Sequence, residues 1–333
     1  KGCYSRTRHN DMKALVTGAN GFIGKHLTQA LLAGGHSVVA FDLHVDRLSD
    51  LPPSEHCQVV QGDLCDRALQ KELVQGVEVV FHLASAHLQQ TLGAGVYEEV
   101  NVNALADLLY AGREAGVRRF IHTSTVGIYG HVLKPPADET GPFNPQSIYG
   151  DTKLKGEQVV NEFFRKTRFP VTILRPAWVY GPGCPRTAKL FRTIKKGRFI
   201  MIGRGDNLRH PIYIADMIDA YLLAAEKEQA VGETFIIAGA RPASTKELVE
   251  TIAGVLATKP VWFSVPLRLA EWMAIPLEAI GRMVHVAIPL TRRSLEFFNT
   301  SNAFNIGKAQ RLLGFEPKTS LQQGMQMTLA AGQ

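Results

Sequence analysis

The chain of 333 residues carries a formal net charge of +7, with 45% hydrophobic and 20% charged side chains. This composition is ordinary for a globular protein and excludes a chain that is disordered throughout. The length fits one large domain or two interlocked ones. The four cysteines form no CxxC pair and have no histidine at metal-ligand spacing. We therefore expect no metal site, and we expect a reducing, cytoplasmic location.

The N-terminal half alternates short β-branched runs with helical patterns, which is typical of βαβ units and a parallel sheet. Helices are predicted over 22–32 and 102–115, and another begins near Tyr149. The sequence therefore predicts an α/β fold with a doubly wound, mainly parallel sheet. Its predicted strands, in chain order, are 13–17, 37–41, 58–60, 79–83, 120–123 and 171–174.

The pattern changes after Arg175, where prolines and glycines cluster up to Pro185. Residues 212–221 and 234–238 have the composition of segments that return to the sheet. The remaining residues, up to Gln333, are predicted to be mostly helical with loops.

The domain organisation follows from these elements. We expect residues 1–11 to be a polar leader before a natural start at Met12. Residues 12–180 would form the sheet domain, with returning elements near 211–238, and residues 181–210 and 239–333 would form a smaller part. The most apolar stretch, 261–290, is interrupted by charges and prolines, so it is not expected to span a membrane.

The excess positive charge lies between Cys184 and His210, where eight cations face one acid, Asp206. One interpretation is a solvated helix face, and the other is a collar for an anionic ligand such as a diphosphate. Nucleic acid is not expected as a partner, because no aromatic residues interleave the charges. The cations are Arg186, Lys189, Arg192, Lys195, Lys196, Arg198, Arg204 and Arg209.

The first predicted strand runs directly into a glycine-rich turn, Gly18-Ala-Asn20-Gly21-Phe22-Ile23-Gly24, which opens the first helix. The first glycine permits the tight turn, the second lets a pyrophosphate approach the backbone, and the third lets the helix pack on the strand. The N-terminus of the helix then offers N–H groups and partial positive charge to the phosphates. The sequence thus predicts a dinucleotide-binding domain of the Rossmann type.

Two aspartates point to the nucleotide that this domain would bind. Asp42 ends the second strand, where a carboxylate accepts hydrogen bonds from ribose hydroxyls and repels a 2′-phosphate. This favours NAD, although Arg47 leaves NADP possible. Asp63 follows Gly62 and is interpreted either as an adenine contact or as a residue of a turn or helix N-cap.

Tyr149 and Lys153 stand four residues apart on a predicted helix and so share one face. A free tyrosine titrates at about 10, and a nearby cation lowers its pKa toward neutrality. The pair is therefore predicted to move a hydroxyl proton in catalysis. Thr123, Ser124 and Thr125 end the fifth strand, at the edge of the sheet where ligands bind, and are candidates to orient the substrate oxygen.

In these motifs the chain resembles the extended short-chain dehydrogenases, which include nucleotide-sugar epimerases, nucleotide-sugar dehydratases and 3β-hydroxysteroid dehydrogenases. The resemblance covers nearly the whole chain and is nearest to the 3β-hydroxysteroid dehydrogenase branch. The matching segments are TGANGFIG (17–24), FD (41–42), GDL (62–64), HLAS (82–85), VNVNA (100–104), TSTVGIYG (123–130), YGDTK (149–153), LRPAWVYGPG (174–183), YIADM (213–217) and KAQRLLGFEP (308–317).

The resemblance implies a role for each matching residue. Tyr149 would be the base, Lys153 its partner, and Thr125 the catalytic hydroxyl with Ser124 as the alternative. It also implies a homodimer through the helices at 102–115 and 149–167. The implied NAD contacts are Gly18, Asn20, Gly21, Phe22, Ile23, Gly24, Asp42, Asp63, Leu64, Leu83, Ala84, Ser85, Asn101, Thr123, Lys153 and Pro176, and the implied substrate contacts are Ser85, Thr125, Tyr149, Trp178 and Arg209.

Two small-molecule substrates remain open. Arg209 resembles the diphosphate-binding arginine of nucleotide-sugar enzymes. Trp178 instead replaces an asparagine found in many of them, and residues 262–283 resemble the apolar insert of hydroxysteroid and sterol dehydrogenases. That insert is interpreted as core helices, a lid over an apolar substrate, or a surface that touches a membrane peripherally. A non-catalytic redox sensor is a third hypothesis, which the presence of Tyr149 and Lys153 disfavours.

Overall fold

A computed structural model describes residues 11–51, 54–87, 93–259, 264–274 and 292–332. Its centre is a seven-stranded parallel sheet in the order β11-β6-β5-β4-β1-β2-β3. This confirms the predicted α/β class and doubly wound sheet. The strands are β1 (Lys13–Thr17), β2 (Ser37–Asp42), β3 (Cys57–Gln61), β4 (Val79–His82), β5 (Arg119–Thr123), β6 (Val171–Pro176) and β11 (Thr234–Ile237).

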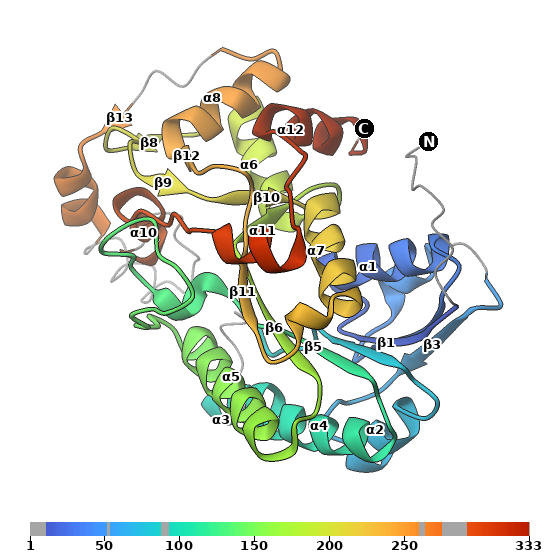
Figure 1. The fold of residues 1–333 in the computed structure, drawn as a ribbon. Coiled ribbons are helices and arrows are strands. Elements are labelled where there is room, and N and C mark those ends of the chain that lie inside the picture. The colour runs from blue at the N-terminus through green and yellow to red at the C-terminus, as the bar shows by residue number, and fades with distance from the viewer. Residues whose placement is uncertain (1–10, 52–53, 88–92, 260–263, 275–291, 333) are drawn as a thin grey trace.

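Helices cover both faces of the sheet (Figure 1). One face carries α1 (Phe22–Ala33), α7 (Ile214–Glu226) and α11 (Gly307–Leu313), and the other carries α2 (Arg67–Leu73), α4 (Ala104–Glu114) and α5 (Ile148–Thr167). Successive residues of a strand point to opposite faces. In β1, Ala14 and Val16 belong to the core under α1 and α7, whereas Leu15 belongs to the core under α4 and α5.

Short one-turn and irregular helices connect the strands. A π-helical turn, Glu99–Asn103, leads directly into α4, so the helix predicted over 102–115 begins in a different hydrogen-bonding pattern. The other connecting helices are Asp46–Leu48, α3 (Ala94–Glu98), Val126–Tyr129 and Glu228–Ala230.

The carboxyl ends of the central strands form the edge of the sheet where a ligand is expected to bind. The strand order reverses at β1, which pairs with β2 on one side and with β4 on the other. Ligands of such sheets bind outside the carboxyl ends of the strands at this switch point. The turns after β1, β4 and β5 therefore meet at one edge.

The smaller part lies above that edge in Figure 1. Its three two-stranded pairs are β7 (Trp178–Tyr180) with β10 (Pro211–Tyr213), β8 (Met201–Ile202) with β13 (Ser264–Val265), and β9 (Leu208–Arg209) with β12 (Ala243–Ser244). Its helices are α6 (Pro185–Lys195), α8 (Thr245–Val255), a helix at 267–274, α10 (Arg292–Asn299) and α12 (Leu321–Ala330).

The assignment of 212–221 to the sheet is wrong. Only Pro211–Tyr213 is a strand, and it pairs with β7 outside the main sheet. From Ile214 onward the chain is helical, with Met217, Ile218 and Tyr221 fully buried. These positions repeat at helical spacing, and that period rather than the β-branched content decides the structure.

The second returning segment is confirmed, because β11 (Thr234–Ile237) pairs with β6 at the edge of the sheet. The expected leader, 1–11, lies outside the described residues except for Asp11, as do 262–263 and 275–283 of the apolar insert. Within the part that the structure describes, no helix is long and apolar enough to cross a membrane.

Candidate active site

The glycine-rich turn after β1 is sterically tight. Gly18 has φ +73°, and a Cβ there would lie 2.6 Å from the Ala84 nitrogen. A Cβ on Gly24 would lie 2.1 Å from the Gly18 oxygen. Only glycine fits these positions without moving the backbone, since real Cβ atoms do not approach so closely. The turn, the start of α1 and the end of β4 therefore form one compact cradle.

This cradle suits the phosphates and ribose of a dinucleotide. α1 begins after Gly21, which has no side chain to cap the helix, and its first turn contains no acid. The helix N-terminus therefore keeps its attraction for an anion. Asp42 stands beside it, and its Oδ2 accepts a hydrogen bond from the Asn20 backbone N–H at 2.9 Å. Burial raises the pKa of Asp42, while this hydrogen bond opposes the rise.

The other predicted nucleotide contacts lie around this edge. Leu83, Ala84 and Ser85 follow β4, and Pro176 ends β6. Leu64 is buried. The Asp63 carboxylate accepts a hydrogen bond from the Cys65 N–H at 2.9 Å, so this aspartate is a turn residue in the structure.

Exchanging Gly18 for alanine should weaken NAD binding at least about tenfold, because the added methyl would displace the cradle backbone. Gly35→Ala is the matched control: Gly35 also has a positive φ, of +84°, but a Cβ added there would meet no atom within 4 Å. Its cost is expected only in stability, about 1 kcal/mol. Calorimetric titration with NAD measures both variants, and equal affinities would contradict the role of the turn.

Tyr149 and Lys153 lie in the first two turns of α5, as predicted. The helix begins because Ser147 caps it, with its Oγ accepting from the Gly150 N–H. Tyr149 is hydrogen-bonded to the Ser85 side chain. The His87 ring packs edge-on against the Tyr149 ring, with centroids 4.6 Å apart. The loop after β4 thus contacts the phenol through two side chains.

Burial dominates the pKa values of this pair. It raises the pKa of Tyr149 to about 12, although the hydrogen bond with Ser85 and the charge of Arg186 lower it. It lowers the pKa of Lys153 to about 8, against the opposing charge of Glu157. At neutral pH both side chains are therefore protonated in the protein alone. A further positive charge at the site, such as an oxidised nicotinamide, favours the phenolate.

The buried Lys153 should make stability depend on pH. An unfolded lysine holds its proton up to a pH of about 10.4, whereas in the folded chain the pKa is about 8. Between these values the unfolded state binds more protons, so stability rises with pH in this window; below it the burial penalty is complete. Lys153→Met should remove this contribution. Unfolding free energies of both proteins across the window test this, and parallel pH curves would contradict it.

The three hydroxyls after β5 have different surroundings. Thr123 Oγ1 is hydrogen-bonded to the Tyr221 hydroxyl at 2.8 Å. Thr125 Oγ1 accepts from the Gly127 N–H at 3.0 Å, which leaves its proton available to a ligand. Ser124 Oγ is buried and has no hydrogen-bond partner among the described residues. Thr125 and Ser124 therefore both remain candidates for the substrate oxygen.

Asn101 links three elements at this edge of the sheet. Its side chain accepts from the Ala86 N–H at 2.8 Å and donates to the Ala86 carbonyl and to Thr152 Oγ1. It thereby ties the loop after β4 to α5, one residue before Lys153.

A buried ion pair fixes α5 below the lysine. Arg175 donates to both carboxylate oxygens of Glu157 and, through Nη1, to the Tyr129 hydroxyl. The two charged side chains are only 5% and 3% exposed. Glu157 also acts on the lysine, because its negative charge opposes the lowering of the Lys153 pKa by burial.

Arg209 is bound within the protein. Its Nη2 donates to the Phe297 carbonyl near the end of α10, and its guanidinium lies over the Phe297 ring, 4.6 Å from the centroid. Burial and the charge of Arg186 lower its pKa to about 10. The structure thus places this predicted phosphate ligand against the carboxyl end of a helix, which attracts cations.

Trp178, in β7, is half-buried, and its Nε1 has no hydrogen-bond partner among the described residues. Arg186, in the first turn of α6, is exposed, and its charge acts on both Tyr149 and Arg209. An aromatic side chain and a cation therefore both lie near the predicted site.

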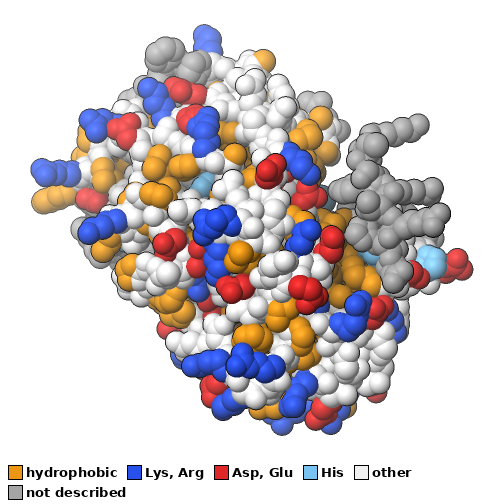
Figure 2. All heavy atoms as spheres, viewed as in Figure 1, with side chains coloured by type: hydrophobic (Ala, Val, Ile, Leu, Met, Phe, Trp, Pro, Cys, Tyr) orange, Lys and Arg blue, Asp and Glu red, His pale blue; other side chains and the backbone are white. Residues whose placement is uncertain are grey.

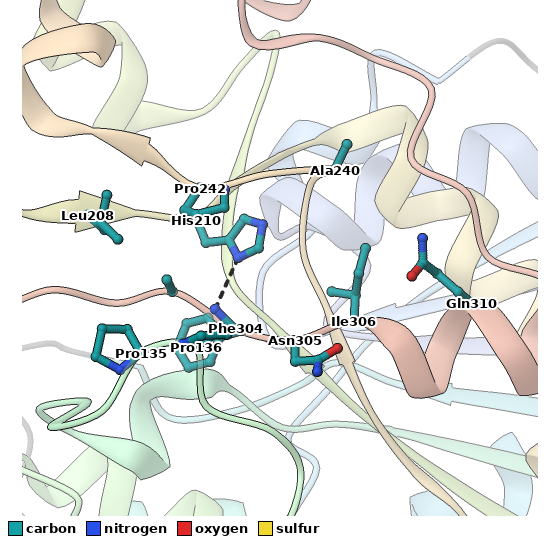
Figure 3. A pocket seen from close by; sticks show the side chains of 11 residues that line it. Pro135, Pro136, Leu208, His210, Ala240, Pro242, Phe304, Asn305, Ile306 and Gln310 are labelled. Atoms are coloured by element: carbon teal, nitrogen blue, oxygen red, sulfur yellow. Dashed lines mark hydrogen bonds between the residues drawn. The ribbon is translucent and has the colours of Figure 1, made fainter.

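Figure 3 shows a cavity of about 360 Å³ in the smaller part. Leu208 and His210 line it, and the His210 ring accepts from the Phe304 N–H at 3.2 Å. Arg209 stands between these two residues, and side chains alternate along a strand, so Arg209 points away from the cavity. None of the predicted site residues lines it.

Sequence reasoning missed His87 and Tyr221 and did not single out Arg186 within the basic segment. His87 and Tyr221 belong to no motif, and only the fold brings them to Tyr149 and Thr123. Among the described residues, no group of three or more His, Cys, Asp or Glu side chains could hold a metal ion.

The relatives found by comparison with known proteins include nucleotide-sugar epimerases and 3β-hydroxysteroid dehydrogenases. UDP-glucose 4-epimerase of Mycolicibacterium smegmatis is 31% identical, over 96% of this chain and 97% of its own. The 3 beta-hydroxysteroid dehydrogenase/Delta 5-->4-isomerase of Mycobacterium tuberculosis is 29% identical, over 94% and 88%. Among solved structures, UDP-glucuronic acid 4-epimerase from Bacillus cereus in complex with NAD matches with a TM-score of 0.78 and 27% identity, over 96% of this chain and 98% of that one.

The sequence profile of one family, described as the NAD dependent epimerase/dehydratase family, matches residues 14–238. That range contains the glycine cradle, Asp42, the hydroxyls after β5 and the Tyr149–Lys153 pair. The chain is therefore an NAD-dependent enzyme and belongs to the NAD dependent epimerase/dehydratase family.

Proposed function

We propose that the enzyme interconverts a secondary alcohol and a ketone on a bulky, mostly apolar substrate of the 3β-hydroxysteroid kind. The observation that carries this proposal is the position of Arg209. Its guanidinium is bound to the Phe297 carbonyl and ring, and the side chain is only 8% exposed. An arginine held in this way is poorly available to a substrate diphosphate. The half-buried Trp178 adds apolar surface.

Tyr149 would remove the proton of the substrate hydroxyl in oxidation and return it in reduction. Thr125 or Ser124 would donate a hydrogen bond to the substrate oxygen, and Ser85 would hold the phenol in place. Lys153 would supply positive charge that favours the phenolate. NAD, when bound at the cradle, accepts or returns the hydride of the carbinol carbon.

A second function, epimerisation or dehydration of a nucleotide sugar, is favoured by Arg186. This guanidinium is exposed, and its charge acts on Tyr149, His87 and Arg209. A diphosphate near the phenol would meet it. Charge-assisted contacts to phosphate are among the stronger hydrogen bonds in proteins.

Thermal denaturation with NAD present distinguishes the two substrates. A ligand at 100 times its dissociation constant stabilises the native state by roughly 2.7 kcal/mol. We expect a 3β-hydroxysteroid to raise the midpoint and UDP to leave it unchanged. A shift with UDP that Arg186→Ala abolishes would contradict the steroid proposal and support the nucleotide-sugar function. Lys189→Ala, an exposed cation on the same helix, is the control.

We also propose a cytoplasmic homodimer. Cys57, Cys65 and Cys184 are free thiols, which suits a reducing compartment. α4 and α5 lie side by side, and the Tyr110 ring of α4 packs edge-on against the Phe163 ring of α5. Tyr110 is 55% exposed. Analytical ultracentrifugation tests the dimer, and a single monomeric species would contradict it.

A further inference from the structure

The helix at 267–274 exposes an unusual amount of apolar surface. Leu269, Trp272 and Met273 are 52%, 80% and 45% exposed. They stand three and four residues apart, so they share one face of the helix. Single exposed apolar residues are common, but a clustered apolar face marks an interaction site.

The opposite face of this helix is anchored in the protein. Ala270 and Ala274 are buried and pack with Ile202 and Leu295 in a small core. The pairing of β8 with β13 holds the start of the helix, and the Gly203 N–H donates to the Val265 carbonyl. The apolar face is therefore presented outward by a fixed element.

Positive charge accompanies this face. Arg268 is exposed on the same helix, and Lys195, Lys196 and Arg198 are exposed just before β8, the strand that pairs with β13. Among the described residues, none of these four forms an ion pair, whereas Arg204 is paired with Asp206. Glu271 is the acid on the exposed side of the helix.

Apolar and basic side chains also lie together in space. Ile200, 50% exposed, stands between the cations and β8. At the left edge of Figure 2, where Figure 1 places the helix that follows β13, hydrophobic side chains lie beside basic and acidic ones.

We propose that this surface, formed by Leu269, Trp272, Met273 and Ile200 with the nearby cations, docks the enzyme on an anionic lipid bilayer. Tryptophan favours the membrane interface, because its ring is apolar and its N–H is polar. Lysine and arginine beside such a face are attracted to anionic headgroups. A protein partner would need charges to match this basic rim, and an anionic bilayer supplies them without a defined shape.

The proposal does not depend on the substrate. Binding to vesicles is measured without substrate or turnover. A protein that does not bind vesicles can therefore still carry out the proposed hydride transfer, and a protein without that activity can still bind vesicles.

Sedimentation with vesicles tests the docking. We expect the full chain with NAD to bind vesicles of equimolar phosphatidylcholine and phosphatidylglycerol, and not vesicles of phosphatidylcholine alone. Trp272→Ser should weaken binding at least about tenfold, because one large side chain no longer enters the interface. Changing Lys195, Lys196 and Arg198 to glutamine should weaken it by roughly fivefold for each charge removed.

Matched controls separate docking from general effects. Leu133→Ser removes an apolar side chain that is 85% exposed outside this surface, and Lys166→Gln removes an exposed cation on α5. Both should bind vesicles as the unchanged protein does. Unaltered NAD affinity verifies that each variant is folded.

Three results would overturn the proposal. One is an absence of binding to the anionic vesicles. Another is equal binding by Trp272→Ser and the unchanged protein. The third is a dimer in solution that Trp272→Ser dissociates while vesicles are not bound, which would assign the surface to a second copy of the chain.

Discussion

Tyr149→Phe is expected to slow hydride transfer by roughly 10²–10⁴-fold, because the change removes the only proposed proton-transfer group. The ring remains, so its packing against His87 is retained. NAD binding should stay the same, since the cradle lies on β1 and α1. Stopped-flow measurement of NADH formation with a 3β-hydroxysteroid gives the rate of the chemical step.

Tyr110→Phe is the control for the loss of a hydroxyl, because Tyr110 is 55% exposed on α4, away from the binding edge. It should keep the full rate. If Tyr149→Phe kept more than about a tenth of the rate, the Tyr149 hydroxyl would contribute less than a tenfold acceleration. The proposed proton transfer would then be wrong.

Arg175→Met is expected to lower the free energy of unfolding by about 3–5 kcal/mol, because it leaves the Glu157 carboxylate buried without its partner. The Glu157 side chain is only 3% exposed, so its charge is shielded little by solvent. The change also removes the hydrogen bonds to Tyr129 and to the Glu139 carbonyl. Urea unfolding followed by circular dichroism measures the loss.

Two further variants test the cause. The double variant Arg175→Met/Glu157→Gln removes the buried charge and should recover part of the stability. Arg241→Met breaks the surface ion pair of Arg241 and Glu247, whose side chains are 67% and 37% exposed. It should lower the free energy of unfolding by about 1 kcal/mol or less. Equal losses in Arg175→Met and Arg241→Met would contradict the role of burial.

The sequence is sufficient to predict those parts of the site that depend on short segments. Gly18 has a positive φ and Gly24 packs on the Gly18 oxygen, so both features lie within one turn, and the Tyr149–Lys153 spacing is set by one helix. Both appear in the structure as predicted. The parallel sheet was also predictable, because its buried strands are short β-branched runs separated by helical patterns.

The parts that depend on tertiary contacts were not predictable. Residues 214–221 are a separate case, because the helical spacing of Met217, Ile218 and Tyr221 was present in the sequence and their β-branched neighbours were given too much weight. The contact of Arg209 with Phe297, 88 residues away in the chain, had no signal in the sequence. The contact of the His87 ring with Tyr149 is also tertiary, and His87 itself belongs to no motif in the sequence.

The substrate proposal is tested most directly by NADH absorbance when the enzyme and NAD are mixed with a panel of bulky secondary alcohols, 3β-hydroxysteroids among them. We expect steady NADH formation that saturates with at least one such alcohol and that Tyr149→Phe suppresses. The substrate proposal would be contradicted if no apolar alcohol gave NADH while a UDP-sugar or dTDP-sugar was epimerised or dehydrated without net NADH release.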